Sequence, residues 1–173
     1  MSALRPYRRR LLLLVLLAAL AGAALAAPAP HVSIATLAQL STPLPVPYDP
    51  TRDAKADIAA GLAKAHASDK LLLVDLGGNW CGDCRVLAGV MRLPEVAAFV
   101  DAHYVVVTVD VGRIDRNLDI PAHYGVKKVE GVPALLVVDA HGRLKDAGHI
   151  AALADARPMT PQALVDWLAR WTD

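Results

Sequence analysis

Cys81 and Cys84 are the only two cysteines in this 173-residue chain. Two residues, Gly82 and Asp83, separate them, and the pair follows an apolar run and opens a helical pattern. Two thiols at this spacing can close into a small, reversible disulfide. Because disulfide stabilisation grows with loop length, a bridge this short constrains the unfolded chain little. The pattern therefore indicates redox chemistry in preference to a structural bridge.

Half of a zinc site is the alternative interpretation of such a pair. Zinc normally takes four ligands, and the six histidines of the chain show no pairing at ligand spacing. We therefore expect no metal here. The sequence also has no Gly-x-Gly-x-x-Gly run opening a helix, the fingerprint of flavin and nicotinamide sites. We expect no cofactor, so that electrons move by thiol–disulfide exchange alone.

The N-terminus has the pattern of a secretory signal peptide. Three arginines at 8–10 precede an apolar run over 11–27, which ends in small residues and predicts cleavage near Ala26 or Ala27. The alternative is an uncleaved membrane anchor, although the run is slightly short for a span of ~20 residues. We therefore expect export, to the periplasm, with membrane anchoring by this segment as the alternative.

Three regions follow from this reading: a signal peptide over 1–27, an arm or linker over 28–50 and one folded domain over 51–173. The arm holds six of the twelve prolines, so it is expected to be extended, either lying against the domain or holding it away from a membrane. Cleavage removes four arginines and no acidic residue. The remaining chain is mildly acidic and has no basic stripe for nucleic acid.

We expect the protein to be a monomer.

The periodicity and element order of residues 51–173 predict an α/β domain with a small central sheet of about four strands and helices on both faces. The expected helices cover 53–67, 84–100 with a bend or break at Pro94, 120–124, and a last helix capped by Thr160; the expected strands cover 70–76, 103–109, 134–139 and 143–148.

The run from Val74 to Cys84, Val-Asp-Leu-Gly-Gly-Asn-Trp-Cys-Gly-Asp-Cys, is followed later by Gly-Val-Pro-Ala at 131–134. Together these motifs resemble the thioredoxin superfamily over roughly residues 53–171. The resemblance implies a thioredoxin-like fold, with a central mixed sheet, and an exported thiol–disulfide oxidoreductase. Cys81 is expected at a helix N-terminus, where amide donors and the helix dipole favour the attacking thiolate. Cys84 would then resolve the mixed disulfide.

The resemblance implies roles for four further residues. Asp75 is expected to be buried with a raised pKa and to shuttle the proton of Cys84; alternatively, it ends its strand facing water. Val132 and Pro133 are expected to form a cis peptide facing the disulfide, where the Val132 backbone pairs with substrate; an ordinary trans proline is the alternative. Trp80 is expected to offer apolar contact surface beside the disulfide, or else to be plain core.

Three residues depart from the commonest thioredoxin pattern. Asp83 replaces proline between the cysteines, Gly77 stands where an aromatic residue is usual, and Gly89 stands where a helix-kinking proline is usual. A negative charge beside Cys81 disfavours its thiolate, which favours a reductase. The resemblance implies a membrane thiol transporter of the DsbD type as electron donor, with oxidised exported proteins or apocytochromes as acceptors. An oxidase or isomerase, and a non-catalytic binding module, remain alternatives.

Overall fold

The computed structural model describes residues 25–173, so the predicted signal peptide lies almost entirely outside the described residues. Within this part of the chain a three-stranded sheet has the order β2-β1-β3, formed by β1 (Leu71–Gly77), β2 (Tyr104–Asp110) and β3 (Ala134–Val138). β1 runs parallel to β2 and antiparallel to β3. The predicted mixed sheet is confirmed. All of β3 and six of the seven residues of β1 are buried, as expected for apolar strands covered on both faces.

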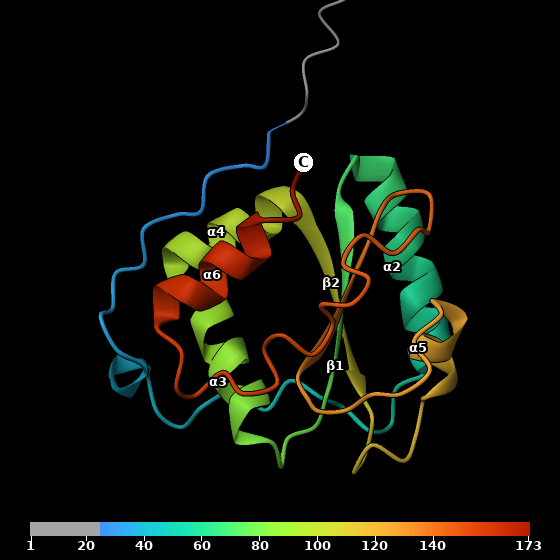
Figure 1. Cartoon of the computed structure of the whole chain (residues 1–173), viewed down its shortest axis with the longest axis horizontal. Helices are drawn as coiled ribbons and strands as arrows, with labels where there is room; N and C mark the ends of the chain where they lie inside the picture. The colour runs from blue at the N-terminus through green and yellow to red at the C-terminus, as the bar shows by residue number, and fades with distance from the viewer. Residues whose placement is uncertain (1–24) are drawn as a thin grey trace, which may run out of the picture.

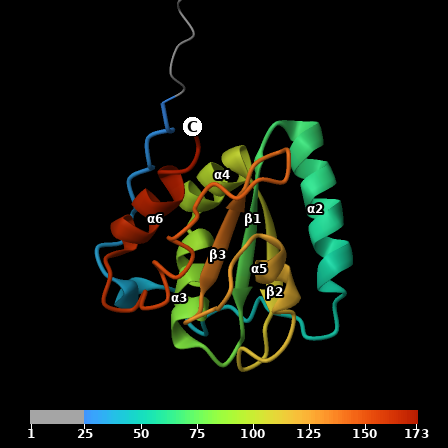
Figure 2. The ribbon, with the colours of Figure 1, turned by 45° about the vertical axis from the view of Figure 1, so that its right-hand side comes forward.

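Helices cover both faces of the sheet, as predicted (Figure 1). One face carries α2 and α5, and the other carries α3, α4 and α6, an arrangement that the turned view in Figure 2 also shows. Their bounds are α2 (Ala54–Ser68), α3 (Gly82–Met91), α4 (Pro94–His103), α5 (Asp119–His123) and α6 (Pro161–Ala169), with a short 3-10 helix, η1 (Leu37–Gln39), in the arm.

Capping residues fix where these helices begin. The Asp53 side chain accepts hydrogen bonds from the backbone N–H groups at positions 55 and 56, which starts α2. The Thr160 hydroxyl accepts a hydrogen bond from the Ala163 N–H (3.1 Å) and so starts α6, whose first residue is a proline. Pro94 divides the predicted helix over 84–100, because a proline fits the first turn of a helix and not its interior.

The fourth predicted strand, 143–148, is wrong. Among the described residues this segment joins β3 through a single bridge between Val138 and Leu144 and a bond from the Lys145 N–H to the Val137 carbonyl (2.7 Å). The buried Asp146 explains the interruption. Its carboxylate accepts the bond from the Val137 N–H (3.0 Å), where a continuing ladder would use a backbone carbonyl.

The arm over 28–50 lies against the domain for its whole length. In Figure 1 it runs along α6 to η1 and then crosses below the sheet to α2. Val32, Leu40 and Tyr48 are buried, and the Arg85 guanidinium of α3 donates to the carbonyls of Leu44 (2.8 Å) and Pro45 (3.1 Å). The arm thus closes one side of the core. No helix in residues 25–173 is long and apolar enough to cross a membrane.

Candidate active site

Cys81 is the N-cap residue of α3. Its backbone is extended, with φ −83° and ψ 117°, and its Sγ accepts a hydrogen bond from the Cys84 N–H (3.2 Å). The sulfur therefore occupies the place that a serine or aspartate oxygen takes at an ordinary helix N-cap. Partial positive charge at the N-terminus of this ten-residue helix favours a thiolate at that point.

The two thiols differ in how readily they ionise. The pKa of Cys81 is lowered to about 7, chiefly because the Cys84 side chain beside it donates a hydrogen bond, while burial and the charge of Asp83 oppose the shift. The pKa of Cys84 is raised far above its usual value by its pairing with Cys81 and by burial. Cys81 keeps 5% of its surface exposed and Cys84 none. A substrate can therefore reach Cys81 and not Cys84.

Asp75 lies in the middle of the sheet, on β1, and is 1% exposed. Burial raises its pKa to about 7, and a hydrogen bond donated by the Tyr48 hydroxyl (2.8 Å) works against that shift. The Cys81 charge adds to the rise in the Asp75 pKa, and the Asp75 charge in turn contributes to the raised pKa of Cys84. The carboxyl is buried, as expected, and does not face water.

The loop before β3 lies against Cys81. The Val132–Pro133 peptide bond is cis, as predicted, and the Cys81 thiol donates to the Val132 carbonyl (3.3 Å). This hydrogen bond places the Val132 backbone directly beside Cys81 Sγ.

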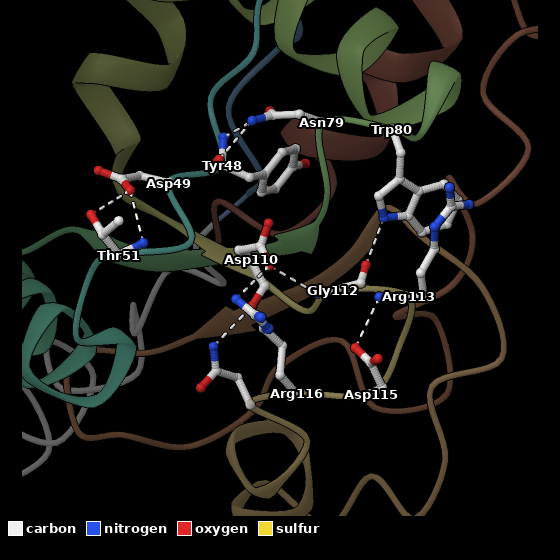
Figure 3. A network of polar contacts seen from close by, with 11 residues as sticks. Tyr48, Asp49, Thr51, Asn79, Trp80, Asp110, Gly112, Arg113, Asp115 and Arg116 are labelled. Carbon is white, nitrogen blue, oxygen red and sulfur yellow. Dashed lines mark hydrogen bonds and ion pairs between the residues drawn. The ribbon is translucent and has the colours of Figure 1, made fainter.

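Trp80 is 46% exposed and is not part of the core. Its Nε1 donates to the Gly112 carbonyl (2.6 Å), and the Arg113 guanidinium lies 4.5 Å from the centre of its ring (Figure 3). Carboxylates brace this loop, because Asp110 accepts from the Gly112 N–H (2.9 Å) and Asp115 from the Arg113 N–H (3.0 Å). The result is a fixed apolar ring, with a cation over it, next to the cysteines in the chain.

Tyr48 belongs to this site, and the sequence analysis missed it. Besides reaching Asp75, its hydroxyl lies beside Cys84, which helps to raise the pKa of Tyr48 well above its usual range after burial and the Asp75 charge. A Cβ on Gly77 would lie 2.5 Å from the tyrosine ring. Tyr48 therefore fills the space beside Gly77, at the position where an aromatic residue is usual. The absence of that aromatic residue was the one feature of the sequence that could have pointed to Tyr48.

Arg157 is the second residue that the sequence analysis missed. Its Nε lies 3.0 Å and 3.1 Å from the two carboxylate oxygens of Asp83, and its backbone N–H donates to the same group (2.9 Å). Asp83 is 7% exposed. Arg157 therefore partly offsets the negative charge next to Cys81, which weakens the sequence argument for a reductase that relied on that charge. No group of three or more metal-ligating side chains occurs in the described part of the chain.

Comparison with known proteins gives this arrangement a family. The model of a family described as thioredoxin-like matches residues 53–140, a range that includes both cysteines and Pro133. The chain belongs to the thioredoxin-like family. It is 34% identical over 90 residues to thioredoxin from Acidithiobacillus ferridurans, a match that covers 52% of this chain and 74% of that protein. The resemblance inferred from the motifs is confirmed.

Two further matches extend the comparison of this thioredoxin-like chain. Thioredoxin from Alicyclobacillus acidocaldarius is 33% identical over 70 residues, covering 40% of this chain and 62% of that protein, which is less than two thirds of the relative. The crystal structure of disulphide isomerase from Xylella fastidiosa Temecula1 superposes with a TM-score of 0.70 at 36% identity. That match covers 75% of this chain and 99% of the isomerase. The predicted thioredoxin-like fold is confirmed.

Proposed function

We propose that this protein is an exported thiol–disulfide oxidoreductase that reduces disulfides of exported proteins. One observation carries the proposal, namely the asymmetry of the two thiols. Cys81 caps α3 with its pKa at about 7 and part of its surface open, whereas Cys84 is fully buried with a raised pKa. Cys81 is thus suited to attack a substrate disulfide, and Cys84 is suited to resolve the mixed disulfide that forms.

The reaction has two displacements. The Cys81 thiolate attacks one sulfur of the substrate disulfide, whose S–S bond breaks, and the leaving thiolate takes a proton from water. Cys84 then gives its proton to the Asp75 carboxylate, and its thiolate attacks Cys81 Sγ. The second substrate sulfur leaves, and Cys81 and Cys84 end as a disulfide. Two electrons pass from the dithiol to the substrate.

Substrate would bind between the Val132 backbone and the exposed ring of Trp80. An extended chain can pair with the backbone at Val132, next to Cys81, and can pack on the part of Trp80 that remains exposed. This mode of binding recognises the backbone of the substrate more than its side chains, which suits a protein that acts on many substrates.

The pKa of Cys81 supports the reducing direction. Strongly oxidising members of the family have an attacking thiol with a pKa of ~3.5, so their reduced form is heavily stabilised. A pKa of about 7 gives Cys81 much less of that stabilisation. Reductase work outside the cytosol needs electrons from across the membrane, and a thiol transporter of the DsbD type is the donor we propose. Export rests on the signal-peptide pattern of the N-terminus.

Disulfide isomerisation is the second candidate, favoured by the 36% identity to a protein described as a disulphide isomerase. The two functions differ in what they need. A reductase consumes one dithiol per substrate disulfide, whereas an isomerase reshuffles a scrambled protein without net electron transfer. A reduction potential near that of thioredoxin (~−270 mV), with no rescue of scrambled protein, supports the reductase; a potential near that of protein disulfide isomerase (~−180 mV), with rescue, supports the isomerase.

Trapping tests the proposal. Cys84→Ser, exported from a bacterial host, is expected to hold substrates as mixed disulfides that dithiothreitol releases, because the resolving sulfur is gone. Cys81→Ser is the matched control and should trap little, since Cys84 is buried. Equal trapping by both variants, or none by Cys84→Ser, would contradict the proposed mechanism and favour a non-catalytic binding module.

A further inference from the structure

We propose that Tyr48 is a positioning residue for proton transfer in the resolving step, because its hydroxyl holds the Asp75 carboxylate in place as the acceptor of the Cys84 proton. The inference rests on the proposed function. It gives the N-terminal arm a part in the chemistry, since Tyr48 lies near the end of the arm and far from the cysteine motif in sequence.

The contact is buried and direct. Tyr48 is 1% exposed, Asp75 is 1% exposed, and the hydroxyl donates to Asp75 Oδ1 across 2.8 Å. The same hydroxyl also lies beside Cys84, which is fully buried. In the described part of the chain, the titratable groups that act on the pKa of Asp75 are Tyr48 from the arm and Cys81 at the start of α3, and Asp75 in turn raises the pKa of Cys84.

The rest of the domain is shaped to hold Tyr48 there. Its backbone N–H donates to Asn79 Oδ1 (3.1 Å), and Asn79 Nδ2 donates back to its carbonyl (2.7 Å), a reciprocal pair drawn in Figure 3. The Thr108 hydroxyl of β2 donates to the carbonyl of Pro47 (3.1 Å). Gly77 leaves the space that the ring occupies. β1, β2 and the turn before α3 therefore all help to hold the Tyr48 side chain in position.

This placement has a chemical consequence. Asp75 must be ionised when the mixed disulfide forms, or it cannot accept the proton of Cys84. A hydrogen bond donated to a carboxylate favours the charged form, whereas burial favours the neutral acid. The hydroxyl keeps its own proton, because burial raises the pKa of Tyr48 beyond reach at neutral pH. Without it, Asp75 would bind its proton more tightly and fewer molecules would be ready to react.

The test compares Tyr48→Phe with Tyr104→Phe. Tyr104 is also buried, and its hydroxyl donates to the Leu168 carbonyl (2.6 Å) on the far side of the fold from α2, so its loss removes a buried tyrosine hydroxyl without touching Asp75. A peptide disulfide is bound to Cys81, and the rate of its release by Cys84 is followed against pH. Tyr48→Phe is expected to shift the rising limb of the pH–rate profile to higher pH by about one unit, and to slow release at pH 7 by up to about tenfold. Tyr104→Phe should leave the limb in place.

Two further measurements separate positioning from packing. In the Asp75→Asn background, Tyr48→Phe should cause no additional loss, because the group it positions is gone. Replacing Tyr48 by 3-fluorotyrosine keeps the ring and strengthens the donor, so the limb should move to lower pH. That variant also serves if Tyr48→Phe fails to fold.

Carbon-13 NMR titration of the Asp75 carboxyl needs no substrate and keeps this inference distinct from the proposed function. An inactive wild-type protein would refute the function, while the titration would still show whether Tyr48 controls Asp75. An Asp75 titration that is the same in wild type, Tyr48→Phe and the 3-fluorotyrosine protein would overturn the inference even if the enzyme is active. So would an equal shift of the limb in Tyr104→Phe.

Discussion

At the scale of single residues, the two carboxylates near the cysteines are held in opposite ways. Asp75 is buried with a hydroxyl as its partner, and its pKa is raised to about 7. Asp83 forms an ion pair with Arg157 across 3.0 Å. The first arrangement suits an acid that gains and loses a proton near neutral pH, and the second suits a carboxylate whose charge is partly offset by a neighbouring cation.

Asp75 makes stability depend on pH. Its pKa in the folded protein is raised above its ordinary value of 3.8, so its contribution to stability is present below about pH 4 and is lost as pH rises through about 7. Asp75→Asn removes this penalty and keeps an acceptor for Tyr48. Urea unfolding should show the variant gaining on the wild type, between pH 5 and pH 8, by on the order of 2 kcal/mol. A gap that is equal at both pH values would contradict this assignment.

Arg157 should control the pKa of Cys81 through Asp83. Arg157→Ala leaves the Asp83 charge uncompensated beside the thiolate, so the Cys81 pKa should rise by a few tenths of a unit to about one unit, limited by solvent screening. The rate of alkylation of Cys81 against pH measures the change. Arg143→Ala, which breaks an exposed pair with Asp139 remote from the cysteines in sequence, is the control. An unchanged or lower Cys81 pKa in Arg157→Ala would count against this account.

At the scale of secondary structure, the junction between β1 and α3 does most of the positioning. β1 carries Asp75 and ends at Gly77, and Cys81 caps the helix that follows. This junction also accommodates the arm, because Gly77 provides space for Tyr48. The strand, the turn and the helix therefore place the acid, the tyrosine and the thiols in one cluster.

Gly77→Ala should destabilise the fold. Its Cβ would lie 2.5 Å from the buried Tyr48 ring, which must shift, and overpacking of this kind costs ~1–3 kcal/mol. Gly82→Ala is the matched control, since its Cβ would meet nothing closer than 3.6 Å. Thermal and urea unfolding of both variants measure the difference. Equal stability of the two variants would show that Tyr48 does not fill this space.

Local pattern predicted most of these elements. The apolar runs that became β1, β2 and β3, the helix that starts beside Asp53 and the break at Pro94 depend on residues close together in sequence, and the bounds lie within three residues of those observed. The strand predicted over 143–148 was wrong because the local sequence does not reveal that Asp146 is buried and that its carboxylate accepts a bond from the Val137 N–H.

At the scale of the whole molecule, the arm is part of the folded unit. The Val32 N–H donates to Gln162 Oε1 (3.0 Å), and Gln162 Nε2 donates to the Pro30 carbonyl (3.1 Å), so the arm is tied to the C-terminal helix α6. Farther along, Leu40 comes within 3.3 Å of where a Cβ on Gly89 would lie. The arm covers α3 at the position where the family usually has a proline.

Contacts of this range explain what the sequence did not predict. The cysteines, Asp75 and Pro133 were recognisable because they form motifs of fixed spacing. Tyr48 and Arg157 reach the site from 27 and 74 residues away from their partners, Asp75 and Asp83. Nothing in local periodicity reports a contact between a proline-rich arm and a buried strand.

Leu40→Ala tests whether the arm contributes to stability. Leu40 is 7% exposed in the core cluster, and truncating a buried leucine costs ~2–5 kcal/mol, with the lower end expected near an edge of the core. Val46→Ala, at a position that is 63% exposed in the same arm, should change the free energy of unfolding by less than ~0.5 kcal/mol. An arm that only tethers the domain would give two variants of equal stability.

The pH dependence of Cys81 alkylation tests the central claim most directly. The reduced protein is treated with iodoacetamide between pH 5 and pH 10, and mass spectrometry assigns the label to each cysteine. Since the pKa of Cys81 is about 7 and that of Cys84 is raised, the label should appear on Cys81 with a midpoint near pH 7 and should spare Cys84. A midpoint at or above ~8.5, the value of an ordinary thiol, or labelling of Cys84 first, would contradict the account.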